Sequence, residues 1–118
     1  MSNASKSANE PVLLARWYDY MKWLLDRVDG FPKNQRFIFG TRLADAALDI
    51  HELLVEASYT REKAELLRRA NVRVEKLRWL VRLAKDRRLI TSRQYEYSAE
   101  QLTGCGKMLG GWIKNTER

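Results

Sequence analysis

Residues 61–88 read REKAELLRRANVRVEKLRWLVRLAKDRR, and this stretch decides the fold. Apolar side chains recur in it every three or four residues, the spacing that places side chains on one face of an α-helix. Basic side chains border this face on both sides. The sequence therefore predicts an amphipathic helix that buries one face in a core. The residues expected on the buried face are Leu67, Ala70, Val74, Leu77, Val81 and Ala84.

The same stretch holds the whole positive excess of the chain. It contains eleven Lys and Arg against four Asp and Glu, whereas the other ninety residues contain eleven of each. Charge concentrated on one helix creates a field directed at an anionic partner, and a nucleic-acid backbone is the first candidate. The candidate nucleic-acid contacts are Arg69, Arg73, Lys76, Arg78, Arg82, Lys85, Arg87 and Arg88.

A solvated helix face is the alternative interpretation of these charges. Glu65 and Arg69, for example, have the spacing of an ion pair along a helix. A basic helix can also dock on an acidic protein, so a protein–protein adaptor is the competing function. Binding to nucleic-acid phosphates releases counterions and weakens with salt. A salt titration with RNA therefore separates the two functions.

Two further helices precede this one. The first is expected to start at Pro11 and to end before Gly30 and Pro32, with Gly30 in a left-handed conformation. Pro32 then opens the second helix, which ends near Ser58. Thr60 is expected to cap the basic helix at its N-terminus.

A fourth helix follows at about Ser92. Thr91 and Gln94 have the T-x-x-Q spacing of a capping box. We expect Trp112 at one edge of its buried face. The residues expected on that face are Tyr95, Ala99, Leu102, Cys105, Gly106, Leu109 and Ile113.

Four helices joined by only a few residues must run antiparallel to their neighbours. The sequence therefore predicts an all-α fold, an antiparallel up-down-up-down four-helix bundle. Residues 11–118 are expected to form this single domain, and residues 1–10 a disordered N-terminal tail. No stretch shows the alternation typical of a β-strand.

The residues that catalysis or metal binding would need are scarce, so an enzyme is not expected. His51 is the single histidine, and Cys105 lies on the expected inner side of its helix. No glycine-rich phosphate cradle is present, and we expect no cofactor or metal. The single cysteine gives no internal disulfide, and no run of eighteen apolar residues exists. A cytoplasmic protein with no membrane contact is expected.

Glycines and tryptophans indicate a contact beyond one helix. Gly104, Gly106, Gly110 and Gly111 fall in the last helix, where each costs about 1 kcal/mol relative to Ala. Small residues at Gly106 and Gly110 would let another helix approach, inside the bundle or between subunits. Exposed tryptophans often mark a subunit interface. Trp23 and Trp79 lie away from the apolar stripes, so a homo-oligomer is expected.

Three blocks of the sequence resemble one known family. They are Phe31-Pro32 with Arg36, the stretch Leu77–Ala84, and the segment from Gln94 through Leu109-Gly110-Gly111-Trp112-Ile113. Together they resemble the accessory variability determinant (Avd) proteins of diversity-generating retroelements. The wider four-helix-bundle superfamily includes proteins encoded in 23S ribosomal RNA intervening sequences, whose role is obscure. A protein of that intervening-sequence type is a second alternative.

The resemblance implies a function and an assembly. Avd proteins form homopentamers, bind RNA and DNA through a basic surface and associate with the element's reverse transcriptase, without a catalytic site of their own. That complex copies a template RNA into adenine-mutagenised cDNA, which replaces a variable repeat. Arg78 and Arg82 match a basic pair of the family's third helix, implying an anionic contact. Gly110, Trp112 and Ile113 match its final motif, implying helix packing.

Overall fold

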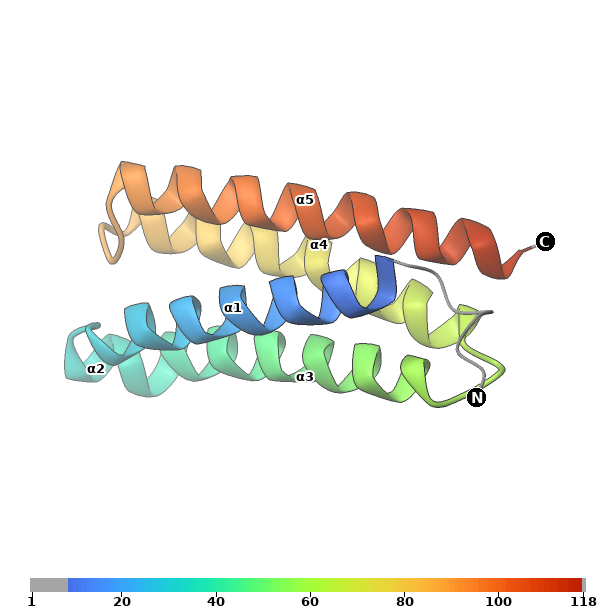
Figure 1. Cartoon of the computed structure of the whole chain (residues 1–118). Helices are drawn as coiled ribbons and strands as arrows, with labels where there is room; N and C mark the ends of the chain where they lie inside the picture. The colour runs from blue at the N-terminus through green and yellow to red at the C-terminus, as the bar shows by residue number, and fades with distance from the viewer. Residues whose placement is uncertain (1–8, 118) are drawn as a thin grey trace.

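The computed structural model describes residues 9–117 and is helical throughout, with no strand in that range (Figure 1). The four long helices are α1 (Asn9–Asp29), α3 (Thr41–Ser58), α4 (Ala64–Asp86) and α5 (Ser92–Thr116). Two short segments, α2 (Lys33–Gln35) and the π-helix η2 (Arg36–Gly40), lead into α3. The all-helical prediction is confirmed. The expected tail lies mostly outside the described residues, and its last two positions belong to α1.

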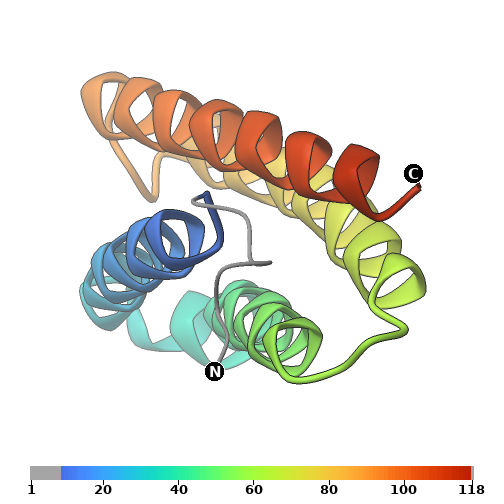
Figure 2. The same cartoon turned by 45° about the vertical axis from the view of Figure 1, so that its right-hand side comes forward.

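The long helices form one elongated bundle of 47 × 23 × 21 Å. Contacts join α1 to α3, α3 to α4, α4 to α5 and α5 back to α1, which closes a ring around the core. Figure 2 shows α1 and α3 on one side and α4 and α5 on the other. In Figure 1 the chain runs leftward along α1 and α4 and rightward along α3 and α5.

All four long helices contribute to one hydrophobic core. The indole Nε1 of Trp17 donates a hydrogen bond to the carbonyl oxygen of Ala47 at 3.1 Å, which joins α1 to α3. The hydroxyl groups of Tyr20 and Ser98 are 2.7 Å apart, which joins α1 to α5. Because the indole of Trp17 and the hydroxyls of Tyr20 and Ser98 all have hydrogen-bond partners, they can be buried in the core.

The six apolar residues predicted on the inner face of α4 are all buried. The predicted start of this helix is wrong, because Thr60 lies in the connection and Lys63 is the residue that precedes the first turn. No side chain caps that end. The backbone carbonyl of Lys63 accepts from the amide of Leu67 at 2.9 Å. Residues 59–63 form the connection between α3 and α4 and are not part of α4.

Within residues 9–117, the left-handed residue is also not where the sequence predicted it. Gly30 has no positive φ, and α1 ends in tight bonds from Gly30 to Arg27 and from Phe31 to Val28. Arg88 has φ 65° instead. The amide of Leu89 bonds the Ala84 carbonyl and that of Arg88 bonds the Lys85 carbonyl, both at 2.9 Å. This pair of bonds is a Schellman motif, which ends α4.

The buried face of α5 is rotated relative to the prediction. Thr91 and Gln94 form the expected capping box, with both reciprocal hydrogen bonds present. Trp112, which was expected at an edge, is only 2% exposed and belongs to the core. The reason is Ser98, a polar residue that apolar periodicity leaves out but that is fully buried against Tyr20. The buried face is Ser98, Leu102, Cys105, Leu109 and Trp112.

Candidate nucleic-acid interface

Helix α4 contributes most of the predicted contacts, and its neighbours α3 and α5 decide which of its cations are free. Of the eleven basic residues between 61 and 88, four form ion pairs within the described residues. These pairs involve partners on α3, on α5 and on α4 itself. The remaining seven have no ion pair in that part of the chain. They are Arg61, Lys63, Arg69, Lys76, Lys85, Arg87 and Arg88.

Two of the paired arginines connect α4 to neighbouring helices. Arg73 reaches Asp49 of α3, with 3.2 Å between Nη1 and Oδ2. Arg78 donates from Nε to Glu75 at 3.2 Å and from Nη2 to the hydroxyl of Thr103 on α5 at 3.3 Å. Arg78 is therefore partly used inside the protein, although the family motif implied an outside contact for it.

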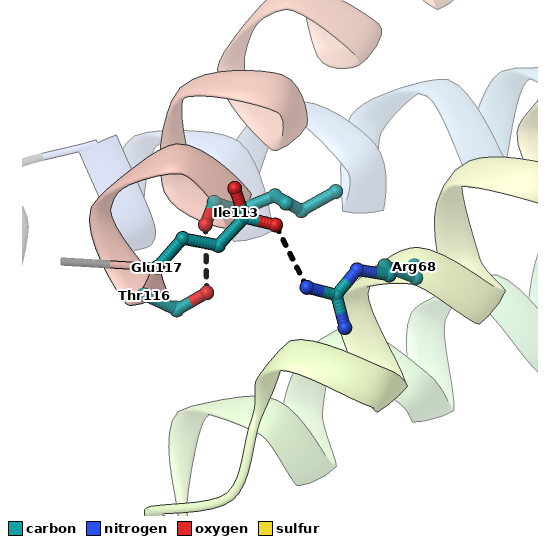
Figure 3. A network of polar contacts seen from close by, with 4 residues as sticks. All are labelled: Arg68, Ile113, Thr116 and Glu117. Carbon is teal, nitrogen blue, oxygen red and sulfur yellow. Dashed lines mark hydrogen bonds and ion pairs between the residues drawn. The ribbon is translucent and has the colours of Figure 1, made fainter.

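A third arginine fastens the end of α5. Figure 3 shows the guanidinium group of Arg68 pointing at the carboxylate of Glu117, 2.7 Å away. Glu117 is the residue that follows α5, next to Thr116, whose hydroxyl donates to the carbonyl of Ile113 at 2.7 Å. A cation at a helix C-terminus is also favoured by the helix dipole. Arg68 thus holds α5 against the first half of α4.

Arg82 is bound only loosely. Its Nε lies 3.8 Å from Asp86 one turn later on α4, and both side chains are more than half exposed, at 57% and 55%. Exposed pairs of this kind contribute about 0–1 kcal/mol, because water screens them and both side chains lose freedom. Arg82 can therefore turn to an outside anion at little cost.

Three unpaired cations form one line on the outside of the helix. Arg69, Lys76 and Arg87 are seven and eleven residues apart, spacings that return to the same side of an α-helix. All three are exposed. From Arg69 to Arg87 the line extends about 27 Å along the axis. We call these three residues the free-cation line.

A shallow groove lies along the first half of this line. Its lining includes four bases and a single acid, Glu65, with Val72 as the apolar member. The bases are Arg68, Arg69, Arg73 and Lys76. A second groove between α4 and α3 shares Arg73 and Lys76 with the first, and from α3 it is lined by Arg42 together with the acids Asp45 and Asp49. The positive surface therefore belongs to α4 and fades toward α3.

The last two predicted contacts lie near the end of α4. The ammonium group of Lys85 is 5.3 Å from the ring centroid of Tyr95 on α5, a cation–π arrangement. Arg88 is exposed in the turn between α4 and α5. All eight predicted contacts thus lie on α4 or the turn after it, but only some of them are free.

An apolar stripe lies next to the free-cation line. Val72, Trp79 and Leu83 are 53%, 71% and 44% exposed and lie on the outer side of α4, opposite its buried face. They are seven and four residues apart, so they form a continuous strip. Trp79 is therefore away from the core, as the sequence predicted. We call these three residues the outer apolar stripe.

The sequence was also compared with known proteins. The sequence pattern of the bAvd-like family matches residues 11–116, which include every described helix except the first two residues of α1. The chain belongs to the bAvd-like family. No curated protein and no solved structure matches it. The resemblance to Avd proteins is therefore confirmed, and the free-cation line lies wholly inside the matched region.

The glycines of the bAvd-like chain have different surroundings from those expected. A Cβ at Gly110 would meet nothing within 4 Å, and one at Gly106 would only touch Arg78 at 3.8 Å. Neither marks a close helix approach inside the described protomer. Gly104, which was not selected from the sequence, lies beneath the guanidinium group of Arg16 on α1, the end of a flexible side chain. Ile113 is partly buried beside the core.

Side chains that could bind a metal or act as a nucleophile are not clustered in the described part of the bAvd-like chain. Among the residues that the structure describes, no three His, Cys, Asp or Glu side chains gather as metal ligands. Burial raises the pKa of the Cys105 thiol to about 11, against the opposing effect of Arg16. A thiol of this kind is a poor nucleophile at neutral pH. None of the described helices has the length and apolar content needed to cross a membrane.

Proposed function

We propose that this bAvd-like protein is a non-enzymatic accessory of a diversity-generating retroelement. In this role it binds RNA or DNA and partners the element's reverse transcriptase in mutagenic retrohoming in the cytoplasm. Family membership supports the retroelement role. The observation that supports nucleic-acid binding is the free-cation line, because these three exposed bases along α4 and its C-cap have no ion pair among residues 9–117.

The free-cation line would act on phosphates and not on bases. Contacts to phosphate oxygens position a nucleic acid without reading its sequence. The line is long enough to follow several nucleotides. A template RNA or cDNA held this way stays close to the polymerase. The local concentration of the substrate rises, and no base-specific contact is required.

Self-association completes the proposal. The outer apolar stripe exposes more large apolar surface than the rest of α4, and a second copy of the chain would cover it. A homopentamer, as the Avd resemblance implies, would display the free-cation line five times. Several weak sites on one assembly bind a long polyanion much more tightly than one site does. Gly110 and Ile113 remain candidate residues for contacts between subunits.

The test measures binding of a fluorescently labelled RNA by anisotropy at several salt concentrations. The variant Arg69→Gln/Lys76→Gln/Arg87→Gln should bind more weakly, and the slope of log affinity against log salt should fall by about two to three. The matched control is Arg93→Gln/Lys107→Gln/Lys114→Gln, which removes three exposed bases from α5 instead. The control should keep most of the slope.

The adaptor alternative predicts a different result. A chain that docks on an acidic protein shows no RNA binding, or binding that salt does not weaken. Equal losses in the α4 variant and the α5 control would mean that net charge, and not the free-cation line, determines binding.

A further inference from the structure

The most exposed pair of neighbouring apolar side chains lies in the π-helix η2, away from the outer apolar stripe. Phe37 is 81% exposed and Ile38 73%. The third member of this apolar run, Phe39, packs against the core instead. Two large apolar side chains next to each other in water are costly unless another surface covers them. We call Phe37 and Ile38 the η2 pair.

The backbone under the η2 pair is held in place. The hydroxyl of Thr41 donates to the carbonyl oxygen of Phe37 at 2.8 Å, and the amide of Thr41 donates to the carbonyl oxygen of Arg36 in the π pattern. A Cβ at Gly40 would lie 2.8 Å from Cγ1 of Val28, so only glycine lets η2 pack this closely on α1. The η2 pair is therefore presented by a fixed turn, an arrangement often found at functional sites.

The charges within the segment that carries the η2 pair have one sign, and Asp29 and Asp45 flank that segment. Residues 30–44 contain three bases, Lys33, Arg36 and Arg42, and no acid. All three bases are exposed. The guanidinium group of Arg36 also donates to the backbone carbonyl of Asp29 at 3.3 Å, which keeps it beside the turn. A matching surface would combine apolar side chains with Asp or Glu.

We propose that the η2 pair docks on an acidic protein surface that brings apolar side chains. This inference rests on the proposed function, which supplies the reverse transcriptase as the protein partner. A protein fits better than a nucleic acid because Ile38 has no ring on which a base can stack.

The experiment uses the full-length chain and the reverse transcriptase of the retroelement to which the proposed function assigns it. Calorimetry measures their affinity for wild type and for the variant Phe37→Ser/Ile38→Ser. The variant should bind the reverse transcriptase at least tenfold more weakly, while its RNA affinity and its mass in solution stay unchanged. Circular dichroism verifies that both proteins are equally helical.

The matched control is Tyr59→Ser, which removes an 86% exposed aromatic side chain from the connection between α3 and α4. That connection lies at the opposite end of the bundle from η2 (Figure 1). The control should bind the reverse transcriptase as wild type does. A second variant, Lys33→Gln/Arg42→Gln, should reduce the salt dependence of that binding, because it removes two of the three exposed bases in residues 30–44.

The possible outcomes separate this inference from the proposed function. If wild type binds RNA but not the reverse transcriptase, the proposed partnership fails and this inference fails with it. If wild type and the Phe37→Ser/Ile38→Ser variant bind the polymerase equally, only this inference is wrong. A variant that loses RNA affinity or changes its mass would mark the η2 pair as a base-stacking or self-association surface, which also overturns the inference. Unchanged salt dependence in the Lys33→Gln/Arg42→Gln variant would exclude an acidic partner surface.

Discussion

The inner side of α4 packs in the core, whereas its outer side is exposed and available for binding. Its inner side is a continuous apolar face, with Leu77 fully buried, whereas its outer side carries Trp79 at 71% exposure next to unpaired cations. An inner face of this kind stabilises the protomer alone. An outer side that combines exposed apolar and basic groups contributes little to folding, so it is explained better by a partner. The difference separates residues that hold the bundle together from residues available for binding.

The largest expected effect is on the inner side. Leu77→Ala should lower the free energy of unfolding by about 2–5 kcal/mol, because it removes buried methyl groups and leaves a cavity. Denaturant unfolding followed by circular dichroism measures it. Val72→Ala on the outer apolar stripe is the control and should change stability by no more than about 0.5 kcal/mol. Similar losses in the two variants would mean that the sides of α4 are not distinct in this way.

On the outer side, Trp79→Ser should weaken self-association and leave the protomer folded. Tryptophans at the centre of an interface typically contribute about 2 kcal/mol or more to association. Light scattering over a range of concentrations should therefore show a lower mass for the variant than for wild type. Trp112→Phe is a useful comparison, since it changes a buried tryptophan on α5. An unchanged mass for Trp79→Ser would remove the outer apolar stripe from the subunit interface.

The sequence predicts a side of α4 well when the pattern lies within α4 itself, and poorly when it depends on residues of other helices. The inner face of α4 was predicted correctly because it repeats within one helix. The free-cation line could not be separated from the other bases, since the partners that occupy Arg68, Arg73 and Arg78 include residues on α3 and α5. Pairing between distant segments is a property of the folded chain.

Local chemistry was misjudged at other positions for similar reasons. The η2 pair was missed because one extra residue in a π turn shifts the helical period, although three consecutive apolar residues before Gly40 were a visible signal. Trp112 was placed at an edge because the polar Ser98 was not expected in the core. Gly30 was expected in the left-handed conformation because glycine adopts it at no steric cost, and the positive φ of Arg88 was not anticipated.

A smaller effect is expected in the turn that ends the outer side. Arg88 has φ 65°, a conformation that costs a residue with a side chain about 1 kcal/mol or more relative to glycine. Arg88→Gly should therefore raise the free energy of unfolding by about 1 kcal/mol. If Arg88 also contacts phosphates, the same variant should bind RNA more weakly and lower the salt slope by about one. A gain in stability without any loss of RNA affinity would exclude Arg88 from the interface.

The smallest effect concerns the sealed interior that the inner side of α4 helps to enclose. Burial raises the pKa of the Cys105 thiol from 9.0 to about 11, so the folded protein favours the neutral thiol. This stabilisation is complete below pH 9 and is lost as the pH rises toward 11, where the unfolded chain has already ionised. Wild type should therefore lose more stability between pH 8 and about 10.5 than Cys105→Ala does. Burial is the main cause of the raised pKa of Tyr20 and acts in both proteins, whereas the smaller contribution of Cys105 to that rise is absent from the variant. If the two proteins lose stability with pH to the same extent, water reaches Cys105. The interior beneath α4 would then be less sealed than the burial of that thiol indicates.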